Sequence, residues 1–272
     1  MANYTAAEVK KLRELTGAGM MDCKNALEQA DGNIEQAVEA LREKSAKSVD
    51  KRTERTTTNG LVAASGGTMI ELNSETDFVA KSADFIQLAE TILQVAVEQQ
   101  PADVEALNAA PLGDGTVLDA VQALSGRIGE KLQIKRYVHL DGPVAVYLHR
   151  RATDLPPAIG TVVSYEGADS DAARSVAMHI AAAQPRYTTR EEVPADVLEA
   201  QRREAEATAK EEGKPEQIVP RIVEGKIKKF YADSVLLEQV SVLDESKKTM
   251  KDLVDEAGLT VRGFARFEVG HA

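Results

Sequence analysis

The chain has 272 residues, 43% of them hydrophobic, which is enough for two or three compact units that each bury a core. Its 33 Lys and Arg are outnumbered by 44 Asp and Glu, and the net charge of −11 argues against a general affinity for nucleic-acid backbones or anionic membranes. A single cysteine, Cys23, excludes an internal disulfide and a zinc site of several thiolates. With no apolar run typical of a signal peptide or a membrane span, the sequence predicts a cytoplasmic protein.

Residues 1–45 are predicted to form a three-helix bundle. Thr5 and Glu8 match a capping box at the start of the first helix. Glycine-containing turns at 17–19 and 31–33 separate three segments whose apolar residues share one helical face. The turns therefore divide this region into three short helices.

Met20 and Met21 lie outside the apolar pattern of the bundle, at its first turn. Two flexible thioethers there can form an adaptable contact surface, or one of them can fill a gap in the small core. The sequence leaves both interpretations open.

Residues 46–58 lack apolar periodicity and are predicted to be a linker or a frayed helix. The first half of the core, 59–135, then begins with a β-hairpin around Gly66-Gly67. Two helices with apolar residues at helical spacing should cover one face of its sheet. The strands are expected at 61–65 and 68–72, and the helices at 83–99 and 117–124.

The second half of the core, 136–272, is predicted to contain strands, helices and a protruding helical hairpin at about 190–230. Strands are expected at 132–140, 144–148, 159–165 and 260–269, and helices at 171–183 and 249–257. The predicted fold class is α+β, with a two-part antiparallel-sheet core.

The hairpin should be antiparallel, because Gly213-Lys214-Pro215 interrupts a long charged helical region. Pro220 is tolerable only if the second helix begins near Pro215, where the missing N–H falls in the first turn. The sequence predicts an apolar seam of Val197, Leu198, Ala205 and Ala209 against Ile218, Ile222 and Ile227.

Phe78 is a large ring at the junction between a predicted strand and a helix. The chain has only five Phe and no Trp, and a polar run, Asn73-Ser74-Glu75-Thr76-Asp77, comes directly before this ring. Binding residues are often displayed at such junctions, which favours an exposed probe for another protein. A Phe followed by Val and Ala is nevertheless more often core, so both interpretations stand.

The residues typical of catalysis do not form a recognisable site. Four scattered histidines, His139, His149, His179 and His271, give no metal-ligand pair. No nucleophile elbow, dinucleotide fingerprint or phosphate-binding loop is present, and a buried thiol is favoured over a nucleophile for Cys23. We therefore expect no enzyme, no metal and no cofactor.

Residues 12–24, LRELTGAGMMDCK, and the later Thr76-Asp77-Phe78-Val79 closely resemble bacterial elongation factor Ts. Further matches follow in the same order: Ile128-Gly129-Glu130, residues 178–182, residues 224–230 and residues 267–270. The chain resembles a short type of the family, because it reaches residue 272 without the C-terminal helical extension of longer members. Ser74 stands where some members have Cys, so that thiol is not expected in the mechanism, and Pro220 is unexpected in the hairpin.

The resemblance implies a guanine-nucleotide exchange factor for GDP-bound elongation factor Tu. It also implies a ubiquitin-associated-like bundle and a two-part core with a helical hairpin. Thr76, Asp77, Phe78 and Val79 would approach the nucleotide site of the partner and displace its magnesium, with secondary contacts from Met20, Met21, Lys24 and His179.

Two other functions remain as alternatives from the sequence. One is a protein-interaction scaffold without exchange activity. The other is RNA binding through Lys226, Lys228 and Lys229, which the acidic total disfavours. Neither nucleic acid nor membrane is an expected direct partner.

Overall fold

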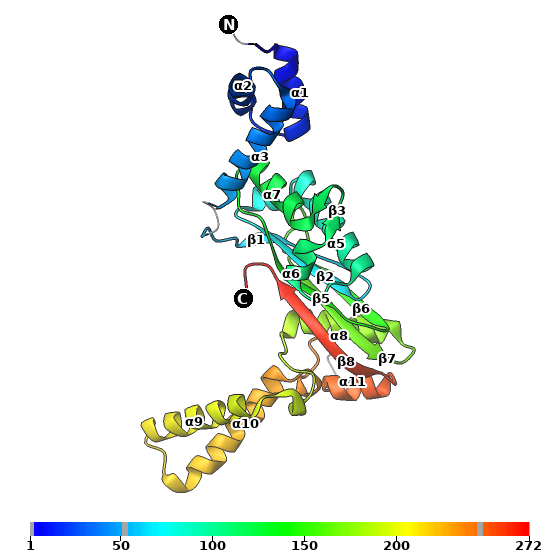
Figure 1. Ribbon diagram of the computed structural model, residues 1–272. Coiled ribbons are helices and arrows are strands. Elements are labelled where there is room, and N and C mark those ends of the chain that lie inside the picture. The colour runs from blue at the N-terminus through cyan, green and yellow to red at the C-terminus, as the bar shows by residue number, and fades with distance from the viewer. Residues whose placement is uncertain (1–2, 51–53, 244–246, 272) are drawn as a thin grey trace. The chain divides into compact units, whose positions relative to one another are not determined.

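The structure is a computed structural model that describes residues 3–50, 54–243 and 247–271 (Figure 1). It combines helices with antiparallel sheets, so the α+β prediction is confirmed. The described chain forms two compact units. The first contains the residues up to Val138, Arg150–Ile159 and the residues from Phe267 on, and the second contains His139–His149 and Gly160–Arg266.

Three helices at the N-terminus of the first unit enclose a small core, as predicted. They are α1 (Ala6–Thr16), α2 (Met20–Gln29) and α3 (Ile34–Asp50). The predicted capping box is present, with Thr5 N donating to Glu8 Oε2 at 2.6 Å and Glu8 N donating to Thr5 Oγ1 at 3.3 Å. Gly17 ends α1 at φ +66°, a backbone conformation that glycine adopts without strain.

The predicted linker over 46–58 is partly helical, because α3 continues to Asp50. Residues 51–53 of that linker lie outside the described residues. The apolar residues of this segment are too few to form a periodic pattern, so the end of α3 could not be predicted from them.

A three-stranded sheet in the order β1-β2-β5 organises the rest of the first unit. Its strands are β1 (Asn59–Ser65), β2 (Thr68–Ser74) and β5 (Gln133–His139). The predicted hairpin is confirmed, because β1 and β2 pair antiparallel with Ser65 opposite Thr68 across the glycine turn. Every residue of β2 is buried, so both faces of this central strand are covered.

One face of that sheet packs against helices that share a core with Ile70 and Leu72. These are α4 (Asp77–Ala80), α5 (Ala83–Gln99), α6 (Val104–Ala109) and α7 (Val117–Ile128). The helices predicted at 83–99 and 117–124 are confirmed. A small hairpin of β3 (Pro111–Leu112) and β4 (Gly115–Thr116) was not predicted, because two-residue strands carry no periodic signal.

Segments from later in the sequence also contact this sheet. Val62 N donates to Pro157 O at 2.8 Å, and Val269 N donates to Ala158 O at 2.9 Å. Residues 150–159 and those from 267 on therefore belong to the first unit, whereas the predicted second half was one continuous range, 136–272. Strand periodicity does not reveal which sheet a strand end will join, so the return of these segments to the first unit was not predictable from it.

A buried ion pair links β2 to β5 in the first unit. The Glu71 carboxylate, 0% exposed, accepts a hydrogen bond from Arg136 Nε. Arg136 also donates to the backbone oxygen of Glu268 at 2.8 Å, and its guanidinium lies 4.7 Å from the centre of the Phe267 ring. The pair therefore joins two strands to the end of β8.

The second unit contains a sheet in the order β6-β7-β8, packed with α8 and α11 around a second core. The strands are β6 (Val144–His149), β7 (Ile159–Glu166) and β8 (Thr260–Glu268), and the helices are α8 (Ser170–Ala183) and α11 (Met250–Glu256). Short 3₁₀ turns lie at Arg190–Glu192, Glu216–Ile218 and Leu236–Glu238. The predicted strands and helices of this region are present within a few residues of their expected ends.

The predicted helical hairpin is formed by α9 (Ala195–Glu211) and α10 (Val219–Ser234), which run side by side (Figure 1). Pro220 falls in the first turn of α10, as required, although that helix begins four residues later than Pro215. Ala205, Ala209 and Ile227 of the predicted seam are buried. The prediction for Ile218 is wrong, because this residue lies in the 3₁₀ turn before α10 and is 43% exposed.

Candidate functional site

The turn after β2 displays Phe78 on the short helix α4. Thr76 is the N-cap of α4, and its hydroxyl accepts a hydrogen bond from Val79 N at 3.4 Å. Val79 and Ala80 are 9% and 2% exposed and pack into the core of the first unit, whereas Phe78 is 74% exposed. The sequence allowed either an exposed or a core position for this ring, and the structure shows that it is exposed.

The four predicted contact residues of this turn have different surroundings. Thr76 and Asp77 are half-buried, and the hydroxyl of Thr76 is already occupied in capping α4. Direct contact through the Val79 side chain does not fit its burial, because consecutive residues of one helical turn cannot all face outward. Phe78 is the residue of this set whose side chain is largely accessible to another protein.

A cation lies beside the exposed ring. Lys81 Nζ is 5.0 Å from the centre of the Phe78 ring, and it is 3.5 Å from a carboxylate oxygen of Asp154. The ammonium group is attracted to the face of the ring, which restricts the positions that the ring adopts. Sequence reasoning missed Lys81, although a basic residue three positions after the Phe on a helical turn was a signal for it.

Exposed apolar side chains flank the turn between α1 and α2. Leu15, Met20 and Met21 are 62%, 54% and 65% exposed, and we call these three residues the bundle patch. The structure thus decides against a methionine that fills the bundle core. Lys24 is exposed on α2 beside this patch, whereas Cys23 is fully buried among the core residues of the bundle.

Burial raises the pKa of the Cys23 thiol, which opposes formation of the nucleophilic thiolate. Its Sγ lies 3.7 Å from the backbone oxygen of Ala18. The preference for a structural thiol over a nucleophile is therefore consistent with its position in the core.

His179 is fully buried in α8, where its side chain is not accessible from the surface, and the expected contact with a partner stays a prediction. Its Nε2 lies 2.9 Å from Gln239 Oε1, and its Nδ1 accepts a hydrogen bond from Val242 N at 3.3 Å. This pair of contacts corresponds to a neutral ring that carries its proton on Nε2. Burial also lowers the pKa of His179 below its ordinary value of 6.5.

The segment held by His179 is apolar and exposed. Val240, Val242 and Leu243 are 52%, 54% and 48% exposed, and we call them the loop patch. The Gln239 side chain donates to Asp233 O at 2.8 Å and to Ala183 O at 3.2 Å, which holds the start of the segment. Sequence reasoning missed this patch, although three aliphatic residues in four positions after a hairpin were a visible signal.

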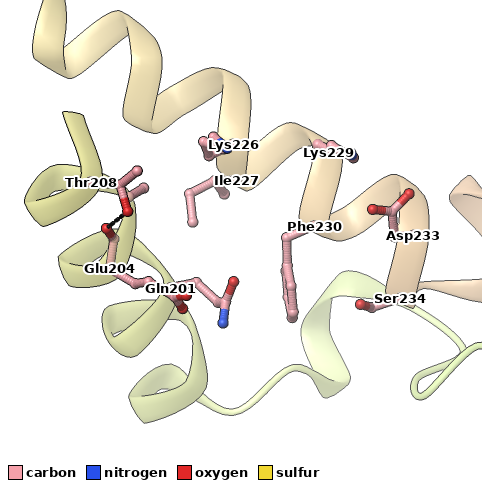
Figure 2. A pocket seen from close by; sticks show the side chains of 10 residues that line it. Gln201, Glu204, Thr208, Lys226, Ile227, Lys229, Phe230, Asp233 and Ser234 are labelled. Carbon is pink, nitrogen blue, oxygen red and sulfur yellow. Dashed lines mark hydrogen bonds between the residues drawn. The ribbon is translucent and has the colours of Figure 1, made fainter. Parts of the chain in front are cut away.

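The helical hairpin contains an open groove between α9 and α10, with a volume of about 260 Å³. Figure 2 shows Ile227 and Phe230 projecting from α10 toward the space beside Gln201 of α9. Charged residues, including Glu204, Lys226 and Asp233, line it as well. This mixture does not indicate one class of ligand.

No group of three or more His, Cys, Asp and Glu side chains in residues 3–50, 54–243 and 247–271 is arranged to hold a metal ion. Over the same residues, no helix combines the length and the apolar character that crossing a membrane requires.

Comparison with known proteins identifies the family. The model of the family described as "Elongation factor TS" matches residues 75–271, a range that begins at the Phe78 turn. Proteins named elongation factor Ts are similar along 100% of both chains: that of Mycobacterium avium is 60% identical, that of Nocardia farcinica 59% and that of Mycobacterium tuberculosis 57%. The expectation of a translation elongation factor is thereby confirmed. The chain belongs to the elongation factor Ts family.

Proposed function

We propose that this protein is a guanine-nucleotide exchange factor, which promotes release of GDP from elongation factor Tu by displacing the magnesium ion at its nucleotide site. The observation that carries the proposal is Phe78, a ring 74% exposed at the start of a helix that Val79 and Ala80 hold against the core. Exposing a large apolar ring in this way has no benefit for folding, so it favours a role in binding.

Displacement of magnesium does not require contact with the nucleotide. Magnesium demands near-ideal octahedral geometry and bridges phosphate oxygens to a GTPase. A ring inserted between partner side chains near the metal can move a supporting loop and weaken both the metal and the nucleotide. Asp77, next to Phe78, would then contact the polar groups around the metal.

One ring is insufficient for a large acceleration, because burying a Phe side chain contributes only about 1.5 to 3 kcal/mol. The bundle patch and the loop patch supply further apolar surface for the same partner. Their binding free energy can be coupled to loop movement at the nucleotide site. Such coupling is reciprocal, so GDP should weaken the complex by the same factor by which the complex weakens GDP.

The proposed activity requires no chemical step by this chain, and hence no cofactor and no catalytic residue. It acts through contacts between proteins, without direct binding of nucleic acid or membrane. Translation is the process that the family serves, and we place the protein in the cytoplasm.

The test is release of a fluorescent GDP analogue from purified elongation factor Tu, with and without this protein, across a range of magnesium concentrations. We expect faster release, with an acceleration that shrinks as magnesium is removed, because the protein and metal depletion act on the same step. A scaffold without exchange activity would bind elongation factor Tu and leave the release rate unchanged. Acceleration that does not vary with magnesium would refute displacement of the metal.

A further inference from the structure

A carboxylate from a distant part of the chain holds the turn that carries Phe78. Glu130 Oε2 accepts hydrogen bonds from the backbone N–H groups of Glu75 and Thr76, at 3.1 and 3.0 Å. Glu130 Oε1 accepts from the Thr76 hydroxyl at 2.6 Å. Three donors from two consecutive residues thus converge on one carboxylate.

The contact is reciprocal. Glu75 Oε1 accepts from the backbone N–H of Lys131 at 2.6 Å, so each glutamate binds the backbone beside the other. Lys131 Nζ donates to Arg55 O at 3.1 Å, and Arg55 Nη1 lies 3.2 Å from Glu75 Oε1. We call this arrangement the Glu75–Glu130 clasp. Hydrogen bonds to a charged acceptor are stronger than neutral ones, so the clasp is a firm restraint on the start of the turn.

The local sequence places Glu130 where it can make these contacts. α7 ends at Ile128, and Gly129 follows at φ +88°, a left-handed conformation that reverses the chain. The Ser125 hydroxyl donates to the backbone oxygen of Glu130 at 2.6 Å and fixes the reversed segment on the helix. Glu130 is therefore presented by a rigid helix end.

The Thr76 hydroxyl transmits the restraint to α4. Its single proton is donated to Glu130, which leaves its lone pairs for Val79 N. A helix of four residues has little stability of its own and depends on its cap and its packing. Val79 and Ala80 fix its inward face, and Glu130 fixes its first turn.

We infer that Glu130 is a positioning residue for nucleotide exchange: it holds the Phe78 turn in its binding geometry before the partner arrives. This inference rests on the proposed function. An exposed ring without such a restraint would lose orientational freedom on binding, which weakens association. Glu130 acts through Phe78 and need not touch the partner.

Glu130→Gln tests the inference, because it keeps the size of the side chain and removes the charge and one acceptor. Ordering a side chain on binding costs about 0.5 to 1.5 kcal/mol, so we expect exchange to be about 2- to 13-fold slower at limiting concentration. Glu90→Gln, at an exposed position on α5, is the matched control and should exchange at the wild-type rate.

A double-mutant cycle separates positioning from a general loss of structure. In a Phe78→Ala background, Glu130→Gln should have almost no further effect, because the ring that it positions is gone. Equal factors in the two backgrounds would overturn the inference. Unchanged exchange by Glu130→Gln in the wild-type background would overturn it too.

Amide hydrogen exchange provides a readout that needs no partner. In Glu130→Gln, the backbone amides of residues 75–81 should exchange about tenfold faster, while the amides of β1 remain as protected as in the wild type. Unchanged protection of residues 75–81 would refute the clasp even if GDP release is accelerated. If the wild type fails to accelerate release, the proposed function fails, and this measurement still decides whether Glu130 holds the Phe78 turn.

If Glu130→Gln does not fold, two substitutions at Thr76 test the same contact. Thr76→Ser keeps the hydroxyl and should retain protection of residues 75–81, whereas Thr76→Val loses it. Equal protection in both variants would contradict the proposed restraint.

Discussion

Replacing Phe78 with alanine should slow nucleotide exchange without changing the stability of the protein. The ring is 74% exposed, so the folded chain gains little from it. Its removal should therefore leave the thermal midpoint of unfolding within a degree or two of the wild type. The core residues of the same helix, Val79 and Ala80, are untouched by this change.

The size of the effect follows from the exposed fraction of the ring. Fully burying a Phe contributes about 1.5 to 3 kcal/mol, and the 74% that remains available for a partner corresponds to about 1.1 to 2.2 kcal/mol. Since about 1.4 kcal/mol corresponds to a factor of ten, exchange should be slower by about 6- to 40-fold. A larger loss would mean that the ring also couples the other contact patches to the nucleotide site.

The assay is release of fluorescent GDP from elongation factor Tu at fixed magnesium, over a range of concentrations of the exchange factor. Leu118→Ala serves as the control, because Leu118 is an apolar residue of the same unit that is 41% exposed and lies outside the Phe78 turn. Wild-type rates from Phe78→Ala would refute the wedge mechanism. The same holds if Leu118→Ala slows release as much as Phe78→Ala does.

Three further predictions concern buried groups. Because burial lowers the pKa of His179 below 6.5, the unfolded chain binds a proton that the folded chain does not, and the free energy of unfolding should fall as the pH drops below 6.5. Urea titrations at several pH values should show that the free energy of unfolding depends less on pH in His179→Gln than in the wild type. An equal pH dependence in the two proteins would contradict this explanation. Cys23 should resist alkylation by iodoacetamide in the folded protein and react after unfolding. Rapid labelling of the native state would show that the thiol is accessible and not buried. Arg136→Leu should lower the free energy of unfolding by about 3 to 5 kcal/mol, because it leaves the buried carboxylate of Glu71 unpaired, and adding Glu71→Leu should restore most of the loss. If Arg136→Leu alone changes the free energy of unfolding in urea as little as a surface substitution does, the result would argue against a buried pair.

Long periodic elements were predictable from the sequence, and short ones were not. The helix Ala83–Gln99 was expected over the same residues, since its apolar positions repeat over several turns. The four residues of α4 are too few for such a pattern. Packing of Val79 and Ala80 decides that Phe78 faces outward, and the composition of the turn is equally compatible with the opposite choice.

Contacts between residues far apart in the sequence are the second reason why the candidate site was not fully predictable. Glu130 binds Thr76, which lies 54 positions earlier in the sequence, and no local sequence pattern indicates that pairing. The burial of His179 depends similarly on Gln239, 60 positions away. The family resemblance pointed to the Phe78 turn, but it could not assign an accessible or a buried environment to each neighbouring residue.

The return of residues 267–271 to the first unit has a consequence for the order of events during synthesis. Arg136 contacts the backbone of Glu268, which is 132 positions later in the chain. The strands β1, β2 and β5 therefore leave the ribosome long before the segment that completes their cover, while domains generally fold from the N-terminus as they emerge. Interrupted translation, or proteolytic trimming of these last residues, would uncover the Glu71–Arg136 pair and damage the first unit from the opposite end of the chain.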